Sequence, residues 1–320
     1  MDWIRQATLS DEDLVSALAA ADRDGTDTQQ VLTEAVRARL ECVDLDRVLA
    51  MLATALEAPE SSDGVGYWLC ITELKGRSTD ETVRACGIWA ESPDPAWRAT
   101  AADIITNLAE VAGPIREPLR RAARPIIERL LEDDDAGVVA AAVGALGYIC
   151  RAPRTRDEDA LLLRFETHPD EDVRWRLVHC LSAGGSPSDI PALIRLTVDP
   201  ASHIRDWATF ALGIQLDADT PEIRAALLAR LDDDDADTRG EAMRGLAVRQ
   251  DRRAVPYICR ELDREDVDEA VIEAAGVMPD PSFLPALEDL LGDLPDDEDV
   301  QAAVEACRTG VTSPRWSAED

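Results

Sequence analysis

The sequence has little positive charge with which to attract a polyanion. Its 320 residues include 33 basic and 65 acidic side chains, so the formal net charge is −32. Lys75 is its single lysine, and the other basic residues are arginines. Neutralising phosphates requires a net basic face, and docking on anionic lipid requires clustered basic residues. This balance argues against a protein that coats nucleic acid or rests on an anionic membrane.

Targeting and membrane-spanning segments are also missing. The N-terminus reads Met-Asp-Trp-Ile-Arg-Gln-Ala, without the basic and then apolar stretch of a secretory signal. No run approaches the roughly 18 apolar residues of a membrane span. The seven cysteines are widely spaced and form no Cys-x-x-Cys pair, which is typical of reduced thiols. We therefore expect a cytoplasmic protein.

The sequence lacks the signatures of known catalytic and metal sites. It contains no nucleophile elbow, P-loop, dinucleotide-binding glycine motif or kinase motif set. Its three histidines, His168, His179 and His203, have no second histidine or cysteine at ligand spacing. The aspartate runs lack the glycine and closing glutamate of a calcium loop. We expect no catalytic residue, no cofactor and no metal.

What the sequence does contain is a repeat. Similar segments begin at intervals of 29 to 41 residues, a spacing typical of a helix–turn–helix unit with variable loops. Most segments carry apolar or small residues at the first position and four, seven and eight residues later, and the pattern fails at Arg308 in the last segment. These positions share one face of a helix, so we expect a buried stripe on each first helix. The segments begin at Trp97, Val138, Val173, Ile204, Thr238, Val267 and Val300.

A second helix is expected in each clear unit. Pro191, Pro221, Pro256 and Pro285 each fall in or near a first turn, where the missing N–H has no helical partner to lose. Asp189 and Thr220 are expected N-caps. The acidic runs 132–135, 232–235 and 296–299 precede first helices, where carboxylates favour the positive end of the helix dipole.

These units resemble a known repeat family. The segments HPDEDVRWRLVHCLS, DPASHIRDWATFALG and DDADTRGEAMRGLAVRQDRRAVPYICREL are similar to prokaryotic HEAT repeats, and more narrowly to the HEAT-like units first named from phycobilisome lyases. Val173-Arg174, Ile204-Arg205 and Thr238-Arg239 occupy the Val-Arg pair of the family pattern. The resemblance is strong from about residue 135 to 308. It implies an all-α fold, a right-handed α-solenoid of antiparallel helix pairs.

The pattern divides the chain into three parts. Residues 1–92 are expected to form divergent helical repeats or a cap, with helices over Asp11–Ala21, Thr28–Leu40, Leu45–Leu56, Gly66–Leu74 and Asp80–Glu91. Residues 93–308 are expected to form the HEAT-like solenoid. Residues 309–320 lose the periodicity and are expected to form a flexible tail.

Two sets of side chains are candidates for binding a partner. The resemblance implies that second helices line the concave face, which would place Arg195, Arg224, Tyr257 and Arg260 there, with Asp289 interrupting the row. Trp175 and Trp207 lie on first helices beside variable polar positions, as in a recognition patch, although Trp207 also suits a core position. For Arg98, Arg174, Arg205 and Arg239, which follow the segment starts, we favour intramolecular pairing with acidic turns.

We interpret the protein as a non-enzymatic scaffold that binds a protein or peptide on its concave face, with a monomer favoured. An alternative is a lyase-like or other enzyme-associated HEAT factor, although no lyase-specific residue can be identified. A nucleic-acid-binding HEAT-like protein or an acidic mimic of DNA fits less well, because a concave basic channel is hard to reconcile with the net charge.

Overall fold

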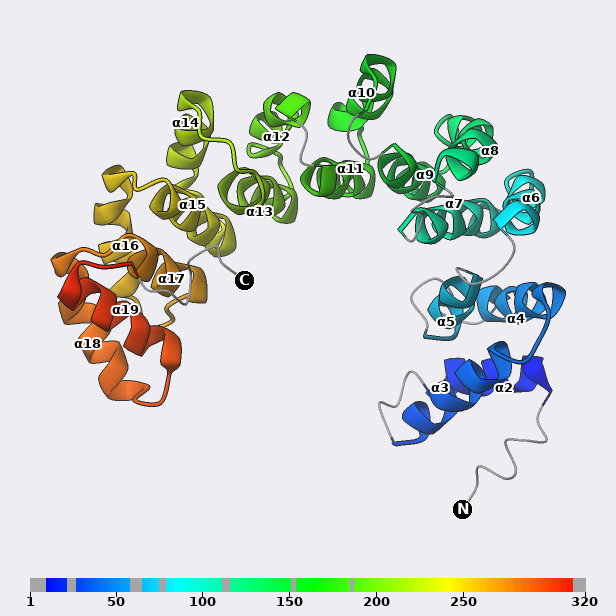
Figure 1. Cartoon of the computed structure of the whole chain (residues 1–320), viewed down its shortest axis with the longest axis horizontal. Coiled ribbons are helices and arrows are strands. Elements are labelled where there is room, and N and C mark those ends of the chain that lie inside the picture. Colours follow the sequence, from blue (N-terminus) through cyan, green and yellow to red (C-terminus); the bar gives the residue numbers. More distant parts are fainter. Residues whose placement is uncertain are drawn as a thin grey trace. The chain divides into compact units, whose positions relative to one another are not determined.

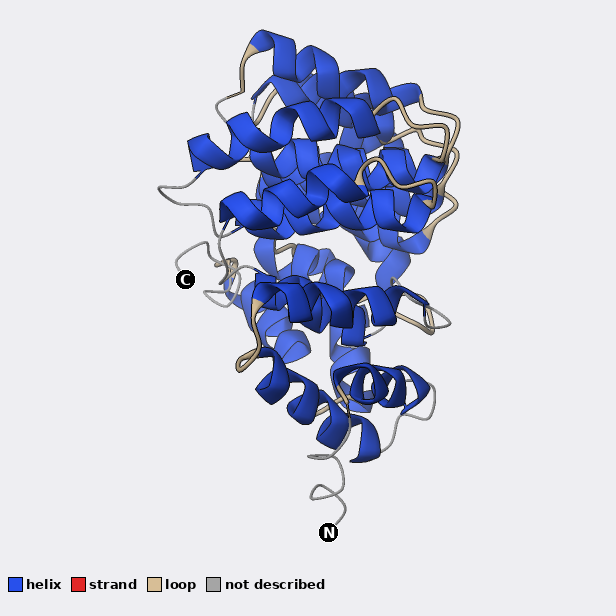
Figure 2. Cartoon of the chain, turned by 90° about the vertical axis from the view of Figure 1, so that its right-hand side faces the viewer, coloured by secondary structure: helices blue, strands red, loops and turns tan. Residues whose placement is uncertain are grey.

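The described part of the chain is helical. The computed structural model describes residues 10–21, 27–57, 65–74, 79–110, 116–150, 154–184 and 187–312, and within these ranges the regular elements are helices with no strand (Figure 2). The expected all-α fold is confirmed. The chain divides into two compact units, Met1–Arg154 and Thr155–Asp320.

The helices of the N-terminal unit closely follow the expected ranges. The first five differ from expectation by at most two residues at either end, because their apolar spacing and turn residues define them locally. The helix α7 packs on α9, and α6 packs on α8. The described helices of this unit are α2 (Asp11–Ala21), α3 (Asp27–Leu40), α4 (Leu45–Glu57), α5 (Val65–Glu73), α6 (Thr79–Trp89), α7 (Pro95–Glu110), α8 (Arg116–Leu130) and α9 (Ala136–Ile149).

The C-terminal unit alternates first and second helices. Its α-helices are α10 (Arg156–Leu163), α11 (Glu171–Gly184), α12 (Ile190–Leu196), α13 (Ser202–Phe210), α14 (Pro221–Arg230), α15 (Ala236–Val248), α16 (Val255–Leu262), α17 (Glu269–Val277), α18 (Leu284–Asp293) and α19 (Glu298–Thr309). Short 3-10 turns over Arg164–Thr167, Pro187–Asp189, Arg252–Ala254 and Pro281–Phe283 precede or follow them.

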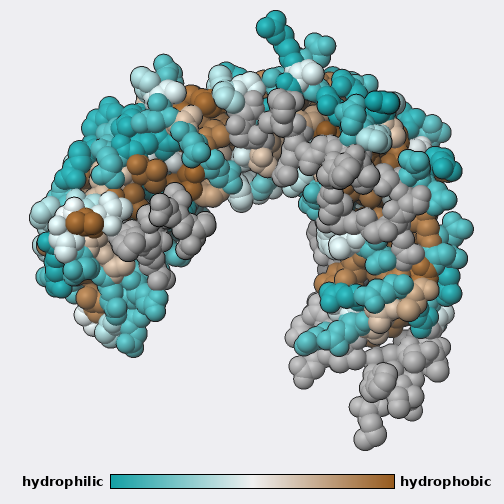
Figure 3. Space-filling model, viewed as in Figure 1, coloured by the Kyte–Doolittle hydropathy of each residue, from teal (hydrophilic) through white to brown (hydrophobic). Residues whose placement is uncertain are grey.

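These helices form two layers. The first helices α11, α13, α15, α17 and α19 pack on one another in succession. Within this unit they form the inner side of a curved stack, and α10, α12, α14, α16 and α18 form its outer side (Figure 1). The surface over α14 and α16 is mainly hydrophilic (Figure 3).

The expected core stripe is confirmed. In the repeats of α11, α13 and α15, the residue at the segment start and the residues four and eight positions later are fully buried. The segment starts are Val173, Ile204 and Thr238. The seventh position holds small buried residues, among them Cys180 and Ala211. Burial of this stripe joins each first helix to the second-helix layer.

The small residues permit one very close helix crossing. After Phe210, α13 continues as a π-helical turn over Ala211–Gln215. A Cβ added to Gly245 of α15 would lie 2.6 Å from the Cα of Gly213 in this turn. Only glycine at residue 245 therefore allows the two backbones to approach this closely.

Arg249 fills the space at the end of this crossing. Its side chain is 5% exposed. Its guanidinium donates hydrogen bonds to the carbonyls of Leu212 (2.7 Å), Gly245 (2.9 Å) and Ala218 (2.8 Å), and also to those of Gly213 and Leu216. These carbonyls lie at or beyond the ends of helices, where they lack helical donors. Arg249 thus satisfies backbone groups of two successive repeats.

Each of the three acidic runs supplies an N-cap to a first helix. Asp135, Asp235 and Asp297 accept hydrogen bonds from backbone amides of α9, α15 and α19 at 2.9–3.1 Å. Thr220 caps α14 as expected. Asp189 does not make a side-chain cap bond, because it ends a 3-10 turn and its backbone is already helical.

The compact units meet at a different place from the expected boundary between residues 92 and 93. That boundary followed where the repeat pattern begins, whereas compactness depends on packing, and α6 packs on α7. At the other end, α19 stops at Thr309 and Gly310 adopts a left-handed conformation (φ 70°). The expected tail continues into residues 313–320, which lie outside the described residues.

Candidate functional site

The six residues expected to bind a partner lie in two separate layers of the C-terminal unit. Arg195, Arg224, Tyr257 and Arg260 stand on α12, α14 and α16, and Trp175 and Trp207 stand on α11 and α13. The expectation that second helices line the concave side is wrong for this unit, because these helices form its outer layer (Figure 1). The arginines and tryptophans therefore do not make one surface.

The outer arginines are held in intramolecular pairs. Arg195 pairs with Glu166, and Arg260 contacts Asp232 at 3.0 Å and lies over the Tyr257 ring at 5.0 Å. Arg224 binds Asp219 at 2.6 Å and Asp251 at 3.0 Å, beside a shallow cavity of about 280 Å³. These bonds engage much of the guanidinium donor capacity that a partner on this side would need.

The arginines that follow the segment starts form a continuous ladder. Arg174 binds the Asp199 carboxylate at 2.7 Å, and the carbonyl of the same Asp199 accepts from Arg205 at 3.0 Å. Arg205 in turn binds the Asp233 carboxylate at 2.8 Å, and the Asp233 carbonyl accepts from Arg239 at 2.9 Å. The preferred intramolecular interpretation is confirmed for this arginine ladder.

Arg98 makes the same contacts in the N-terminal unit. It binds Asp133 at 2.7 Å and the carbonyls of Ser92 and Pro93 at 3.0 and 3.1 Å. The hydrogen bonds from Arg98 lower the pKa of Asp133, against the opposing effect of burial. Each arginine thus fixes the turn before its own helix to a carboxylate of the next repeat.

The inner layer carries a cluster of aromatic rings on two adjacent helices. Trp175 of α11 makes edge contacts with His179 (4.2 Å between ring centroids), His203 (5.0 Å) and Trp207 (5.6 Å). Trp207 of α13 also contacts Phe210 at 5.5 Å. His203 is exposed and the other four are half-buried. We call these five residues the aromatic cluster.

Helix geometry explains why this cluster faces away from the core. At about 100° per residue, the second and sixth positions after a segment start lie opposite the buried stripe, and the third lies at its edge. Trp175, Trp207 and His179 occupy these positions. Because the stripe faces the outer layer, the cluster faces the inner side of the unit. Trp207 is accordingly half-buried, not a fully buried core residue.

The same helix positions carry carboxyl groups and one arginine from Asp206 of α13 onward. Asp206 of α13, Glu241 and Arg244 of α15, and Glu273 of α17 continue the surface; we call them the acidic cluster, and both clusters together the inner strip. Arg244 joins the two, since it lies over the Phe210 ring at 5.9 Å and its Nε lies 2.6 Å from Glu273 Oε2. One arginine thus stands among three carboxyl groups.

Two carboxyl groups of this cluster, those of Glu241 and Asp206, have raised pKa values. Burial is the largest cause of the raised pKa of Glu241, about 7; Arg244 opposes it, and Asp206 and Glu273 add to it. Burial also raises the pKa of Asp206 to about 6, with further contributions from the carboxylates of the α15 and α17 N-termini. Charged forms of both residues are disfavoured in the free protein.

This makes a prediction for Glu241→Gln. The pKa of Glu241 is about 7 in the folded chain, above its ordinary 4.5. Its contribution to the free energy of unfolding therefore becomes less favourable as pH rises from 4.5 through 7. We expect Glu241→Gln to raise the free energy of unfolding by about 1–3 kcal/mol at pH 8, and to change it little at pH 4.5. Urea unfolding at both pH values measures this. The control is Glu265→Gln, because Glu265 is exposed. A Glu241→Gln variant less stable than the wild type at pH 8 would contradict the prediction.

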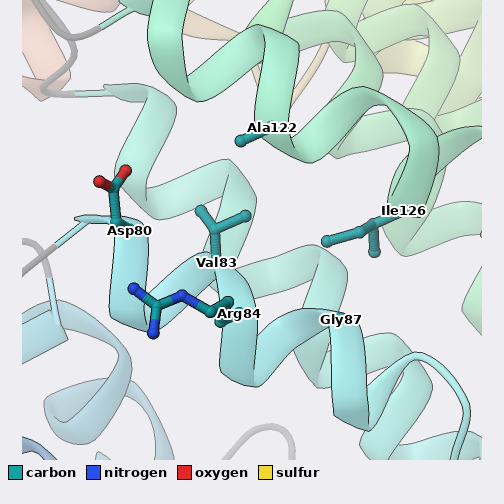
Figure 4. A pocket seen from close by; sticks show the side chains of 6 residues that line it. All are labelled: Asp80, Val83, Arg84, Gly87, Ala122 and Ile126. Atoms are coloured by element: carbon teal, nitrogen blue, oxygen red, sulfur yellow. The ribbon is translucent and has the colours of Figure 1, made fainter.

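A further cavity lies in the N-terminal unit, between α6 and α8. It measures about 420 Å³ and is lined by Asp80, Val83, Arg84, Gly87, Ala122 and Ile126 (Figure 4). The figure shows apolar side chains from both helices, with the two charged residues toward one end.

The cysteines, histidines and aspartates form no metal centre within the described ranges. No group of three or more His, Cys, Asp or Glu residues there is placed to hold a metal ion. Cys180 and Cys307 are buried at the small core position, as expected. Burial raises the pKa of Cys86 to about 12. Among the described helices, none combines the length and apolar character needed to cross a bilayer.

Sequence reasoning missed most of the inner strip. Trp175 and Trp207 were the only residues of the strip expected to bind a partner, and no sequence pattern singled out His203 or Asp206. The usable signal was that the third and sixth positions hold Trp207 and Phe210 after Ile204 but Glu241 and Arg244 after Thr238.

Comparison with known proteins identifies relatives of this chain. Over 134 residues it is 34% identical to the protein YibA of Escherichia coli strains K12 and O157:H7; this covers 42% of the chain and about half, 48%, of YibA. The crystal structure of E. coli YibA superposes with a TM-score of 0.68 at 23% identity, covering 86% of this chain and 96% of that one. This likeness shows a common fold.

The family comparison covers more of the chain. The pattern described as HEAT repeats matches residues 123–213 and 224–308, which together exceed half of the chain and include both the arginine ladder from Arg174 onward and the inner strip. The chain therefore belongs to the HEAT-repeat family.

Proposed function

We propose that this chain is a non-enzymatic scaffold that binds a protein or peptide on the inner strip of its C-terminal unit. The observation that carries the proposal is the aromatic cluster, where two tryptophans, a phenylalanine and two histidines meet on a helix face opposite the core. Tryptophans in such positions dominate the binding energy of many protein interfaces.

The internal contacts of the clusters support this choice over the outer arginines. The aromatic rings touch one another across two repeats and remain partly exposed, so a partner can bury them without breaking a bond. A partner on the outer side would have to compete with the ion pairs of Arg195, Arg224 and Arg260. Surface pairs of this kind yield little net binding energy when exchanged.

Affinity capture with tagged protein from the source cells tests the proposal. Proteins captured by the wild type are identified, purified and titrated calorimetrically. We expect Trp175→Ala to weaken binding at least about tenfold. Trp68→Ala, which removes an exposed tryptophan of α5, is the matched control and is expected to leave binding unchanged.

The double variant Arg195→Ala/Arg260→Ala distinguishes the two surfaces. It removes two half-exposed arginines of the outer layer and is expected to bind the captured partner like the wild type. Binding that survives Trp175→Ala but is lost in the double variant would place the partner on the outer layer. Circular dichroism confirms that each variant remains helical.

A further inference from the structure

The inner strip carries negative charge that the folded chain does not neutralise. Arg244 is shared between Glu273, at 2.6 Å, and Glu241, at 3.6 Å. Asp206 adds a third carboxyl group, and Asp237 and Asp268 lie close enough to act on it. The acidic cluster therefore holds more carboxylates than cations.

Individual oxygens of this cluster also lack hydrogen-bond donors. Asp206 Oδ1 and Glu241 Oε2 are inaccessible to solvent in the described structure, and neither accepts a hydrogen bond there. Buried carboxylate oxygens are usually paired, and leaving them without donors is unfavourable. Burial is the largest cause of the raised pKa values of both residues, and neighbouring carboxylates add to it. A cation bound beside these carboxyl groups would favour their ionised forms.

The aromatic cluster beside them is suited to the same chemistry. A guanidinium or ammonium group is attracted to the face of a tryptophan, and Arg244 already lies over the Phe210 ring within the strip. Burial, with the nearby Arg176, lowers the pKa of His179, so this imidazole is neutral at pH 7 and does not repel a cation. Arg176 is exposed and lies at the far end, on α11.

We propose that the inner strip binds an extended basic segment of a partner protein, with arginine or lysine side chains at the acidic cluster and neighbouring side chains on the aromatic cluster. This rests on the proposed scaffold function and specifies the partner's chemistry. An extended segment fits because the strip continues across α11, α13, α15 and α17, so that successive side chains meet successive repeats. The proposal commits to a basic protein segment on grounds of charge complementarity.

A short fluorescein-labelled peptide that alternates arginine with leucine is the probe, and its anisotropy is measured with the full chain. The matched peptide replaces each arginine with glutamate. Because the whole chain is strongly acidic, a basic peptide also binds it without specificity. The experiment therefore compares two triple variants that each lose three carboxyl groups: Asp206→Asn/Glu241→Gln/Glu273→Gln in the strip, and Asp263→Asn/Glu265→Gln/Asp266→Asn on the exposed loop after α16.

We expect the strip variant to bind the arginine peptide at least about tenfold more weakly than the loop variant at physiological salt. Trp175→Ala is expected to weaken it as well, and Trp68→Ala is not. Equal losses in the two triple variants, or preference for the glutamate peptide, overturn the proposal. The strip variant is not expected to unfold, because it removes unfavourable charge, and its thermal unfolding checks this.

The two proposals fail in different ways. If Trp175→Ala abolishes capture of a purified partner but the arginine peptide binds without regard to the strip, the scaffold function stands and the basic partner class is wrong. If neither the partner nor the peptide depends on Trp175 or the acidic cluster, both proposals are wrong.

Discussion

Replacing Arg249 with methionine is expected to lower the free energy of unfolding by about 3–5 kcal/mol, the range seen when one partner of a buried charged network is removed. The guanidinium donates to carbonyls of five residues from two repeats and is 5% exposed. Methionine fills most of the volume but donates no hydrogen bond. The carbonyls that face it then stay buried without donors, at a cost for each.

Urea unfolding followed by circular dichroism measures this loss. The matched control is Arg252→Met, where the side chain is 56% exposed and its main partner is Asp280, so a change below about 1 kcal/mol is expected. Arg249→Lys keeps the charge but loses the planar fork, and we expect an intermediate loss. A loss no larger than that of the control would show that the carbonyls find other donors.

The second large effect is expected at the buried rung of the arginine ladder. Arg174 and Asp199 form a bidentate pair, and their side chains are 9% and 4% exposed. Arg174 also donates to the carbonyl of His168 at 2.8 Å. Arg174→Leu leaves the Asp199 carboxylate buried without its cation, and we expect a loss of about 3–5 kcal/mol in unfolding free energy.

A double-mutant cycle separates the pair from the rest of the site. Arg174→Leu/Asp199→Asn is expected to be more stable than the sum of the single losses predicts, because the unpaired charge is gone. Arg260→Leu serves as the exposed comparison, since that arginine is 50% exposed, and is expected to change stability by about 1 kcal/mol or less. Strict additivity of Arg174→Leu and Asp199→Asn would contradict a direct coupling.

Much of the fold was predictable from the sequence because it is set by local periodicity. The spacing from Val173 to Leu181 identifies one buried helix face whatever the helix packs against, and the same spacing recurs at Ile204 and Thr238. The arginine ladder was predictable for a similar reason. In the repeats that start at Trp97, Val173, Ile204 and Thr238, an arginine follows the segment start and lies close in sequence to an acidic turn.

The side that each layer faces was not predictable in this way. Periodicity separates buried from exposed positions, but curvature depends on how closely neighbouring first helices pack compared with neighbouring second helices. At Gly213 and Gly245 the first-helix layer packs almost backbone to backbone, and this sets the inner side locally. The expected row of Arg195 and Arg260 therefore lies on the opposite side.

Arg249 and the charge imbalance of the inner strip were also beyond sequence reasoning. Arg249 stands in a loop beside Arg252 and Arg253, and its composition and spacing do not distinguish it from them. Its role arises because the π-helical turn leaves carbonyls of α13 facing it. Likewise, Asp206 and Glu241 lie one repeat apart in the sequence, and only packing of α13 on α15 brings their charges together.

The arginine ladder has a consequence for how such a protein changes length during evolution. The side chain of Asp199 accepts hydrogen bonds from Arg174, and its backbone carbonyl accepts one from Arg205. Asp233 accepts from Arg205 and Arg239 in the same way one repeat later. A gene segment that runs from one of these aspartates to the next thus encodes both partners of one contact between repeats. It supplies a carboxylate for the arginine of the preceding repeat and an arginine for the carboxylate of the following one. Because repeat stability depends on nearest neighbours, duplicating such a segment inserts a repeat whose joints are satisfied on both sides, and deleting one rejoins turns that already match.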